Sequence, residues 1–386
     1  MSGRTEDAAT HDDGLTEPRV STFELFFDLV FVFAFTRITE SIAEDTTWRG
    51  MGRGVLIFAM LWWAWGAYAW LTNSVRTDDG PSRIVLSASM GAVLVVAIAV
   101  PDAFGDSGPA FAFGYLVVIL LHGVLFSLAA DSPTDAARGI RRLAPTNLGS
   151  AALLVGAAFT DDALQTTLWI VAVGVTFAGP FLTGVADFTV RPAHFVERHG
   201  LIVIVALGES IVAVGAAESH EVDAALAVSA LVAMALISGL WWAYFDGESA
   251  GAEHALHATD GADRSRMARD IYSYLHIPLV LGVVLAALGI KKTLQHSDED
   301  LATVAAVALG GGVALFYAAL AGIRLRRRSR AGSARLAAVV AATALIPVAT
   351  QAPAIVSLTI LAALTLVVAV ATRAARAGQA TPPLSA

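Results

Sequence analysis

The sequence predicts an all-α protein, a polytopic bundle of about twelve transmembrane helices (ten to twelve). Of its 386 residues, 56% are hydrophobic and only 15% are charged, against roughly 25% charged in an ordinary soluble domain. The mean hydropathy is +0.67. The apolar residues form long runs, and a run of about 18 or more is typical of a transmembrane helix. Together these observations exclude a soluble enzyme.

Hydropathy gives each span in order. The predicted ranges are 22–39, 52–72, 83–101, 110–130, 144–160, 165–186, 199–217, 224–245, 271–290, 301–322, 335–351 and 353–372. The fifth span is weak, and a short turn near Pro347 and Pro353 separates the last two, so ten or eleven crossings are also compatible. Residues 1–20 lack the features of a signal peptide and are predicted to be a disordered cytoplasmic tail. Residues 373–386 are predicted to be a second cytoplasmic tail.

The basic residues predict the orientation of the chain. With the N-terminus inside, most of the 25 lysines and arginines fall in cytoplasmic segments. The predicted outer loops hold only Arg49, Arg53, Lys291 and Lys292. The positive-inside rule therefore places both termini in the cytoplasm.

The two halves of the chain resemble each other. Leu61-Trp-Trp-Ala-Trp65 in the second span matches Leu240-Trp-Trp-Ala-Tyr244 in the eighth, and the offset between such matches grows slowly along the chain. We therefore predict two six-helix repeats, residues 21–190 and 191–372, that share one orientation. Parallel repeats of this kind recur in transporters, with the substrate path between them. Chance likeness between apolar helices is the alternative.

Ionisable residues inside the spans are costly and call for a reason. Glu24 and Asp28 are four residues apart and lie on one face of the first helix, and Arg37 follows near its outer end. Glu24 can instead cap the helix. Glu209 lies near the middle of the seventh span, where a carboxyl must be protonated, paired or in a wet cavity. Its structural alternative is a hydrogen bond between helices.

Histidines next to the spans offer further candidates. His194 and Glu197 have i, i+3 helical spacing, which suits a proton relay or a metal, but equally a solvated helix start. His276 opens the ninth span, and a contact with Glu209 would make a proton relay. We assign no catalytic, metal or cofactor site. The sequence has no cysteine, no soluble-enzyme motif and no basic patch for nucleic acid.

Three other patterns have plain interpretations. The arginine run from Arg324 to Arg330 is expected to anchor the topology and to attract anionic lipid. The glycines from Gly310 to Gly312 are expected to permit close helix packing. We expect six tryptophans to serve as membrane-interface anchors and in packing, namely those at positions 62, 63, 65, 70, 241 and 242.

Several of these motifs resemble the bacterial low temperature requirement protein A family. The resemblance rests on Ser21-Thr-Phe-Glu-Leu-Phe-Phe-Asp-Leu-Val-Phe-Val-Phe33, His194-Phe-Val-Glu-Arg-His-Gly-Leu-Ile-Val203, Leu207-Gly-Glu-Ser210 and Tyr272-Ser-Tyr-Leu-His276. It implies a multi-span protein of the bacterial cytoplasmic (inner) membrane, and it implies no established biochemical activity. The motif positions that it carries over, without roles, are Glu24, Asp28, His194, Glu197, His199, Glu209 and His276.

Three functions compete on this evidence. The first is a gradient-driven, proton-coupled transporter or ion pathway, with Glu209 and Asp28 as titrating carboxylates and His276 or Arg37 as modulators. The second is a membrane-embedded enzyme acting on lipid, with acid, base or metal-ligand roles for Glu197, His194 and His199. The third is a structural or sensory protein that responds to the state of the bilayer. The expected partners are the lipid bilayer and an unknown ion or small molecule.

Overall fold

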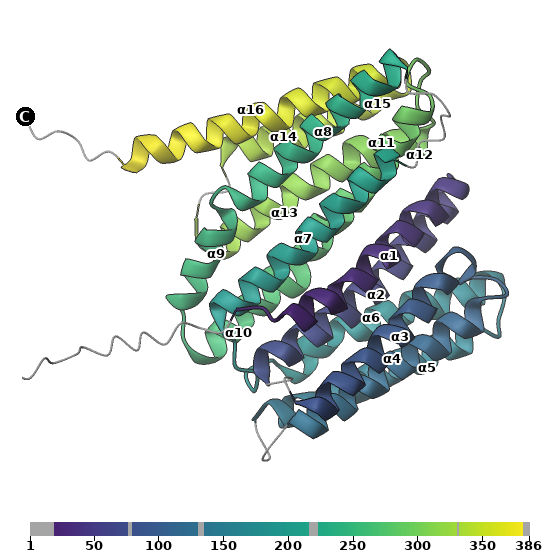
Figure 1. Cartoon of the computed structure of the whole chain (residues 1–386), viewed down its shortest axis with the longest axis vertical. Helices are drawn as coiled ribbons and strands as arrows, with labels where there is room; N and C mark the ends of the chain where they lie inside the picture. The colour runs from purple at the N-terminus through teal and green to yellow at the C-terminus, as the bar shows by residue number, and fades with distance from the viewer. Residues whose placement is uncertain (1–18, 76–78, 130–134, 216–222, 330–331, 381–386) are drawn as a thin grey trace, which may run out of the picture.

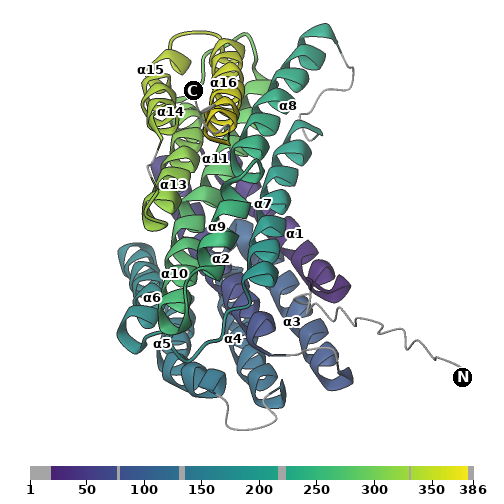
Figure 2. The same cartoon turned by 90° about the vertical axis from the view of Figure 1, so that its left-hand side faces the viewer.

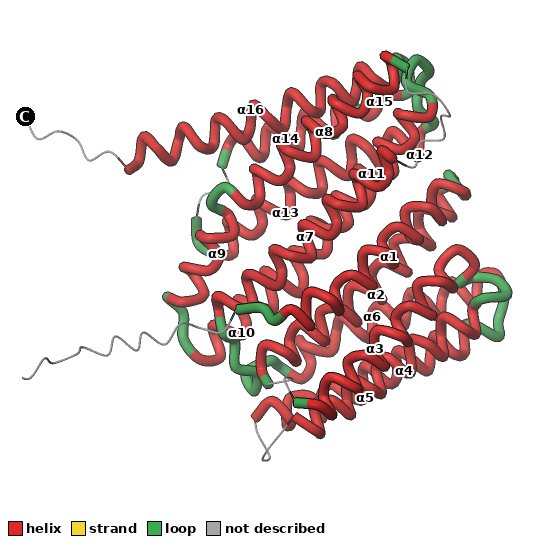
Figure 3. The backbone as a smooth tube through the Cα atoms, in the orientation of Figure 1, coloured by secondary structure: helices red, strands yellow, loops and turns green. Residues whose placement is uncertain are grey.

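The computed structural model describes residues 19–75, 79–129, 135–215, 223–329 and 332–380. In these ranges every regular element is helical and there is no strand (Figure 3), so the predicted all-α class is confirmed. The first group of helices comprises α1 (Thr22–Glu44), α2 (Trp48–Ser74), α3 (Gly80–Ala99), the short η1 (Val100–Asp102), α4 (Gly108–Ala129), α5 (Asp135–Ala157) and α6 (Asp162–Thr183).

The second group contains more interruptions. It comprises α7 (Pro192–Gly215), α8 (Ala224–Phe245), α9 (Glu248–His257), α10 (Gly261–Ala268), the π-helix η2 (Arg269–Leu275), α11 (His276–Gln295), α12 (Thr303–Ala306), the π-helix η3 (Val307–Gly311), α13 (Gly312–Arg326), α14 (Ser333–Ala344), α15 (Ile346–Ala349) and α16 (Ala354–Ala380). π-helical turns occur frequently at functional sites.

Nine helical segments among the described residues are long and apolar enough to cross a membrane. They contain α2, α3, α4, α6, α7, α8 with α9, α10 with α11, α12 with α13, and α16. The other three predicted spans also coincide with helices, namely α1, α5 and α14 with α15, but α1 and α5 carry several charges and α14 with α15 is short. The protein is therefore a multi-pass helical membrane protein, and the count of about twelve spans stays a prediction.

The two groups of helices lie side by side (Figure 1). Helices α1–α6 occupy one side of the molecule and α7–α16 the other, and the view turned by 90° shows the same separation (Figure 2). Helix α1 joins the groups because it packs on α2 and α3 on one side and on α7 and α11 on the other. Seven of the eight predicted site residues lie on α1 or α7, and four of them contact the other helix across the seam between the two.

Helices α11 and α13 approach each other closely through glycines. A Cβ atom on Gly282 would lie 2.6 Å from the carbonyl oxygen of Gly312, and one on Gly312 would lie 2.6 Å from that of Gly282. A Cβ on Gly310 would lie 2.8 Å from the carbonyl oxygen of Ala342 on α14. Small residues let backbones approach in membrane helices, so the predicted packing role is confirmed for Gly310 and Gly312, whereas a Cβ on Gly311 would meet only Val307, at 3.6 Å.

The space around each glycine predicts opposite effects for two Gly→Ala substitutions, one at the close approach and one at an open position. Gly282→Ala is expected to destabilise the protein by about 1–3 kcal/mol, because the new methyl group meets backbone that has no room to move. Gly91→Ala in α3, where an added Cβ meets nothing within 4 Å, is expected to stabilise by up to about 1 kcal/mol through helix propensity. Thermal unfolding in detergent measures both, and a Gly282→Ala protein as stable as wild type would contradict the packing account.

Candidate functional site

Two carboxylates on α1 face the interior of the protein at its first two turns. Glu24 is 5% exposed and Asp28 2% exposed. Glu24 also completes a capping box: its Oε2 accepts from the backbone N–H of Ser21 at 2.8 Å, and Ser21 Oγ accepts from the backbone N–H of Glu24 at 3.2 Å. The capping role considered for Glu24 is therefore present, but its other oxygen contacts residues of α7.

Arg198 of α7 bridges the two carboxylates. Its Nη1 lies 2.9 Å from Glu24 Oε1, and its Nη2 donates to Asp28 Oδ1 at 3.1 Å. The indole Nε1–H of Trp65, from α2, donates to the same Asp28 oxygen at 2.9 Å. Arg198 is 1% exposed, so this ion pair is enclosed by protein.

His194 extends the network to α2. Its Nε2 lies 3.2 Å from Glu24 Oε1, and its Nδ1 lies 3.2 Å from the amide Nδ2 of Asn73. The orientation of Asn73 is fixed because its Oδ1 accepts from the backbone N–H of Arg191 and its Nδ2 donates to the Arg191 carbonyl. The amide therefore donates to His194 Nδ1, which makes His194 a neutral imidazole with its proton on Nε2, directed at Glu24.

We call this group the seam cluster. Its members are Glu24, Asp28, Trp65, Asn73, His194 and Arg198. With His194 neutral, two carboxylates share one guanidinium, and the cluster has a charge of about −1 in a buried position. A buried charge without a partner is costly, so the cluster can lower its free energy by binding one proton.

Glu209 lies further along the same face of α7. It is 2% exposed, and Thr36 Oγ1 of α1 donates to its Oε2 at 2.5 Å. The interhelical hydrogen bond considered for Glu209 is therefore present. Because Glu209 follows Arg198 by three helical turns, the two side chains are separated by roughly 16 Å along the helix.

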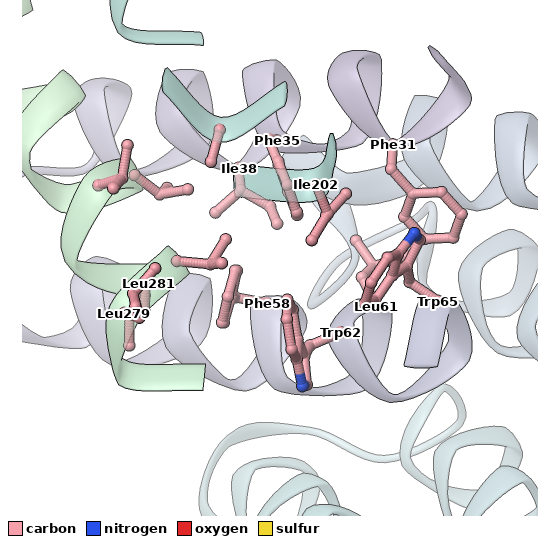
Figure 4. Packing of buried hydrophobic residues seen from close by; sticks show 14 of the residues in the cluster. Phe31, Phe35, Ile38, Phe58, Leu61, Trp62, Trp65, Ile202, Leu279 and Leu281 are labelled. Carbon is pink, nitrogen blue, oxygen red and sulfur yellow. The ribbon is translucent and has the colours of Figure 1, made fainter. Parts of the chain in front are cut away.

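An apolar layer fills the space between the seam cluster and Glu209. Figure 4 shows its side chains, which come from α1, α2, α7 and α11 and point toward one another. Five of these side chains are 0% exposed, namely Phe31, Phe35, Ile38, Phe58 and Ile202. The layer of buried apolar side chains therefore lies between the two buried acidic positions.

The relay predicted between Glu209 and His276 is not formed. The ring of His276 lies 5.6 Å from that of His199, ten residues before Glu209 on α7, which is roughly 15 Å away along the helix. His276 Nδ1 instead contacts the carbonyl oxygen of Ile271 at 2.9 Å, and its Nε2 contacts Tyr244 Oη at 2.9 Å. His199 packs among aromatic rings, with its Nδ1 2.8 Å from the Phe195 carbonyl oxygen.

Two other predicted site residues lie apart from the seam cluster. Arg37 forms an ion pair with Glu40 on its own helix and contacts neither Asp28 nor Glu209 in the described structure. Glu197 is exposed and accepts from the backbone N–H of Val20 at 3.1 Å, while His194 on the same helix is buried against Glu24. The i, i+3 pair considered for metal binding is therefore split, and no group of three metal-ligating side chains occurs among the described residues.

Arg198, Trp65 and Asn73 are the members of the cluster that the sequence analysis missed as site residues. Arg198 directly precedes the predicted span 199–217, so the positive-inside count places it among the cytoplasmic basic residues rather than among the site residues. The missed signal is helical spacing: Arg198 follows His194 by four residues and so shares its face, opposite two acids at the same depth in the first span. An unpaired pair of acids in a membrane helix calls for a cation on another helix.

A cavity of about 50 Å³ lies beside the seam cluster, between α2, α4, α5, α6 and η2. Three indoles of α2 line it, and each N–H is bonded: Trp62 to the Ser273 carbonyl at 3.1 Å, Trp63 to Asn147 Oδ1 at 3.1 Å, and Trp70 to Ser273 Oγ at 2.9 Å. The predicted packing role of these tryptophans holds, but Trp62 and Trp63 are buried rather than at a membrane interface. Trp241 and Trp242, each 43% exposed, face outward.

The fold and the site together define a multi-pass helical membrane protein with a buried ion cluster at the seam between its two groups of helices. The chain belongs to the bacterial low temperature requirement A protein (LtrA) family, whose model matches residues 19–370. It is 30% identical over 319 residues to the uncharacterized protein RA0937 of Rhizobium meliloti (strain 1021), covering 78% of this chain and 76% of that protein. No solved structure matches the chain. The family resemblance seen in the motifs is thus confirmed.

Proposed function

We propose that this protein is a gradient-driven, proton-coupled transporter or ion pathway of the bacterial cytoplasmic membrane, with the seam cluster as its proton-binding site. One observation carries the proposal: two buried carboxylates share Arg198, while the hydrogen bond from Asn73 keeps His194 neutral. Ionisable groups inside membrane helices mark proton relays and substrate paths in pumps and transporters. Because the buried cluster has a charge of about −1, uptake of one proton would remove the cost of burying that charge.

Asp28 is the acceptor that the contacts favour. Its Oδ1 accepts from both Trp65 and Arg198, whereas its Oδ2 is buried and has no hydrogen-bond partner among the described residues. Protonation on Oδ2 would leave the two bonds to Oδ1 in place and would bring the cluster to neutrality. Glu24 Oε1 likewise accepts no hydrogen bond, but it lies 2.9 Å from Arg198 Nη1 and 3.2 Å from His194 Nε2, whereas no such ion-pair contact is formed by Asp28 Oδ2 in the described structure.

Glu209 would be a second proton position, nearer the outer side. It lies on the same seam, and the apolar layer separates it from Asp28 (Figure 4). A proton passes between them only if α1 and α7 separate enough to admit water. Such a layer is what a coupled transporter requires, because a continuous wet path would dissipate the gradient.

The packing of the helices supports the predicted repeats. In the first group, α1 packs on α2 and α3, α2 packs on α6, and α5 packs on both α4 and α6. In the second group, α7 packs on α8 and α11, α8 packs on α16, and α14 packs on both α13 and α16. The same pattern of neighbours in both groups is expected from duplication, and transporters built from such repeats bind substrate between the two groups.

The ends of the chain support an even number of crossings. Helix α1 begins and α16 ends on the same side of the molecule in Figure 1. Helix α9 lies on that side as well, and Arg327, which follows α13, contacts Glu248 of α9, as the positive-inside rule requires for a cytoplasmic face. Both observations favour cytoplasmic termini.

The indole-lined cavity is the position that we propose for the solute. Trp62 in its wall packs against Trp65, with ring centroids 5.2 Å apart and planes tilted by 38°, and Trp65 donates to Asp28. A solute that displaces Trp62 would therefore disturb the hydrogen bond that holds the proton acceptor. Both groups of helices line the cavity, through α2 and through Ser273 of η2.

The test is proton flux in liposomes that hold purified wild-type protein and a trapped pH dye. A potential is imposed with potassium and valinomycin, first without solute and then with a bacterial cytoplasmic extract trapped inside. We expect acidification faster than in protein-free liposomes in at least one arm. No difference in either arm, from protein that stays monodisperse, would contradict the proposal.

That negative result would leave the structural or sensory interpretation, for which Glu209→Gln should still support growth in the cold. The three residues proposed for the enzyme do not form one group in this structure. Glu197 points away from the buried His194, and His199 is enclosed by aromatic rings.

A further inference from the structure

A second buried ion cluster, which shares no residue with the seam cluster, lies around the first residue of α9. Glu248 is 2% exposed, and its Oε1 lies 2.7 Å from Arg324 Nη1 and 2.6 Å from Arg335 Nη2. Arg327 Nη1 lies 3.5 Å from Glu248 Oε2 and donates to the Glu248 carbonyl oxygen at 3.0 Å. Arg376 Nη2 is 3.6 Å from Oε1. One carboxylate thus meets arginines from α13, α14, α16 and the turn after α13.

Two glycines make room for these guanidinium groups. A Cβ on Gly247, which has a φ of +97°, would lie 2.2 Å from Arg376 Nη1. A Cβ on Gly251 would lie 2.7 Å from Arg327 Nη2. Part of the run expected to be a topology anchor is therefore turned inward, against α9.

The charges around Glu248 do not balance. Even without Arg324, three arginines face two carboxylates. The arginines are Arg327, Arg335 and Arg376, and the carboxylates are Glu248 and Asp246, the latter 3.7 Å from Arg376. Burial lowers the pKa of the Arg327 guanidinium, and the attraction of Glu248 only partly opposes this. A positive excess in a partly buried position is stabilised by an added anion.

An open hollow adjoins this excess charge. It has a volume of about 640 Å³ and lies between α9, α10 and the end of α13, with Arg326, Arg327 and Arg328 in its wall. Arg326 is held by Asp270 at 2.7 Å, whereas Arg328 is exposed and has no ion pair among the described residues. The acid that contributes to the wall, Asp263, is paired with Arg266. Donors on Arg327 and Arg328 are therefore available to a ligand.

We propose that this hollow binds a phosphate group through Arg327 and Arg328. The planar guanidinium matches the oxygens of a phosphate and forms charge-assisted hydrogen bonds with it. The phosphate can belong to the headgroup of an anionic lipid in the leaflet where the basic residues gather, or to a soluble phosphate compound. The inference does not depend on proton transport.

The experiment uses the full-length protein in phosphate-free detergent and two kinds of probe. The lipid arm compares the apparent melting temperature with phosphatidylglycerol and with phosphatidylcholine. The soluble arm titrates inorganic phosphate by calorimetry. A shift with phosphatidylglycerol but not phosphatidylcholine supports a lipid headgroup, heat with inorganic phosphate supports a soluble source, and both together support recognition of the phosphate itself.

Three variants test whether binding depends on the two arginines of the hollow. Arg328→Gln removes an exposed side chain and should leave the fold intact, and we expect it to weaken binding of the responding probe about tenfold. Arg327→Gln should weaken it at least as much. Arg141→Gln is the matched control, because Arg141 is another exposed arginine without an ion pair in the described structure. No response to either probe in wild type, or an Arg328→Gln affinity equal to that of Arg141→Gln, would overturn the proposal.

Discussion

Replacing Arg198 by glutamine is expected to lower the free energy of unfolding by about 3–5 kcal/mol, the largest effect that we predict for one substitution. Glu24 and Asp28 would then be two buried carboxylates without their cation, while the indole of Trp65 and the neutral His194 supply only hydrogen bonds. Loss of one partner of a buried ion pair leaves the other partner's desolvation uncompensated. Chemical or thermal unfolding in detergent measures the change.

The matched tests use the acids themselves. Combining Arg198→Gln with Glu24→Gln and Asp28→Asn removes every formal charge of the cluster and should recover most of the lost stability, since a neutral replacement of a whole buried ion group is often tolerated. Arg141→Gln should unfold like wild type, because Arg141 is exposed. An Arg198→Gln protein as stable as the Arg141→Gln protein would mean that the seam cluster does not hold α1 to α7.

Asp28→Asn is expected to reduce proton flux to the level of protein-free liposomes while leaving the protein at least as stable as wild type. Asparagine keeps an oxygen that can accept from Trp65 and Arg198, but it cannot take up a proton. The substitution also brings the cluster charge from about −1 to about zero, which removes a cost of burial. The dye assay and the unfolding assay are run on the same preparation.

Two further carboxylates complete this test. Glu209→Gln should also lower the flux, because Glu209 is the second proposed position on the seam. Glu197→Gln should not, because that side chain is exposed and its recorded bond is to the backbone of Val20. Wild-type flux in the Asp28→Asn protein would show that protons do not pass through the seam cluster. Equal losses in all three variants would point to a general defect rather than to a pathway.

The helix that carries each acid could be predicted from the sequence, but the residue that pairs with each acid could not. Glu24 and Asp28 were predicted to share a face and to be functional, and both lie in the seam cluster. Arg198 was overlooked because its role depends on which face of α7 meets α1. Glu209 was predicted near the middle of its span, but it lies toward the end of α7 (Pro192–Gly215), and it does not pair with His276. His276 lies beside His199, at the other end of the seam from Glu209.

The sequence by itself determined that the protein is helical, embedded in a membrane and a member of the LtrA family. These properties follow from local features: the length of apolar runs, the cost of placing charges within them, and short motifs. The tertiary structure decided which residues meet. It brought Arg198 between two acids of α1, enclosed the indoles of α2 around a cavity, and turned Arg327 against Glu248. The physical reason is that such contacts depend on the rotation of each helix about its axis and on its register against helices distant in the chain.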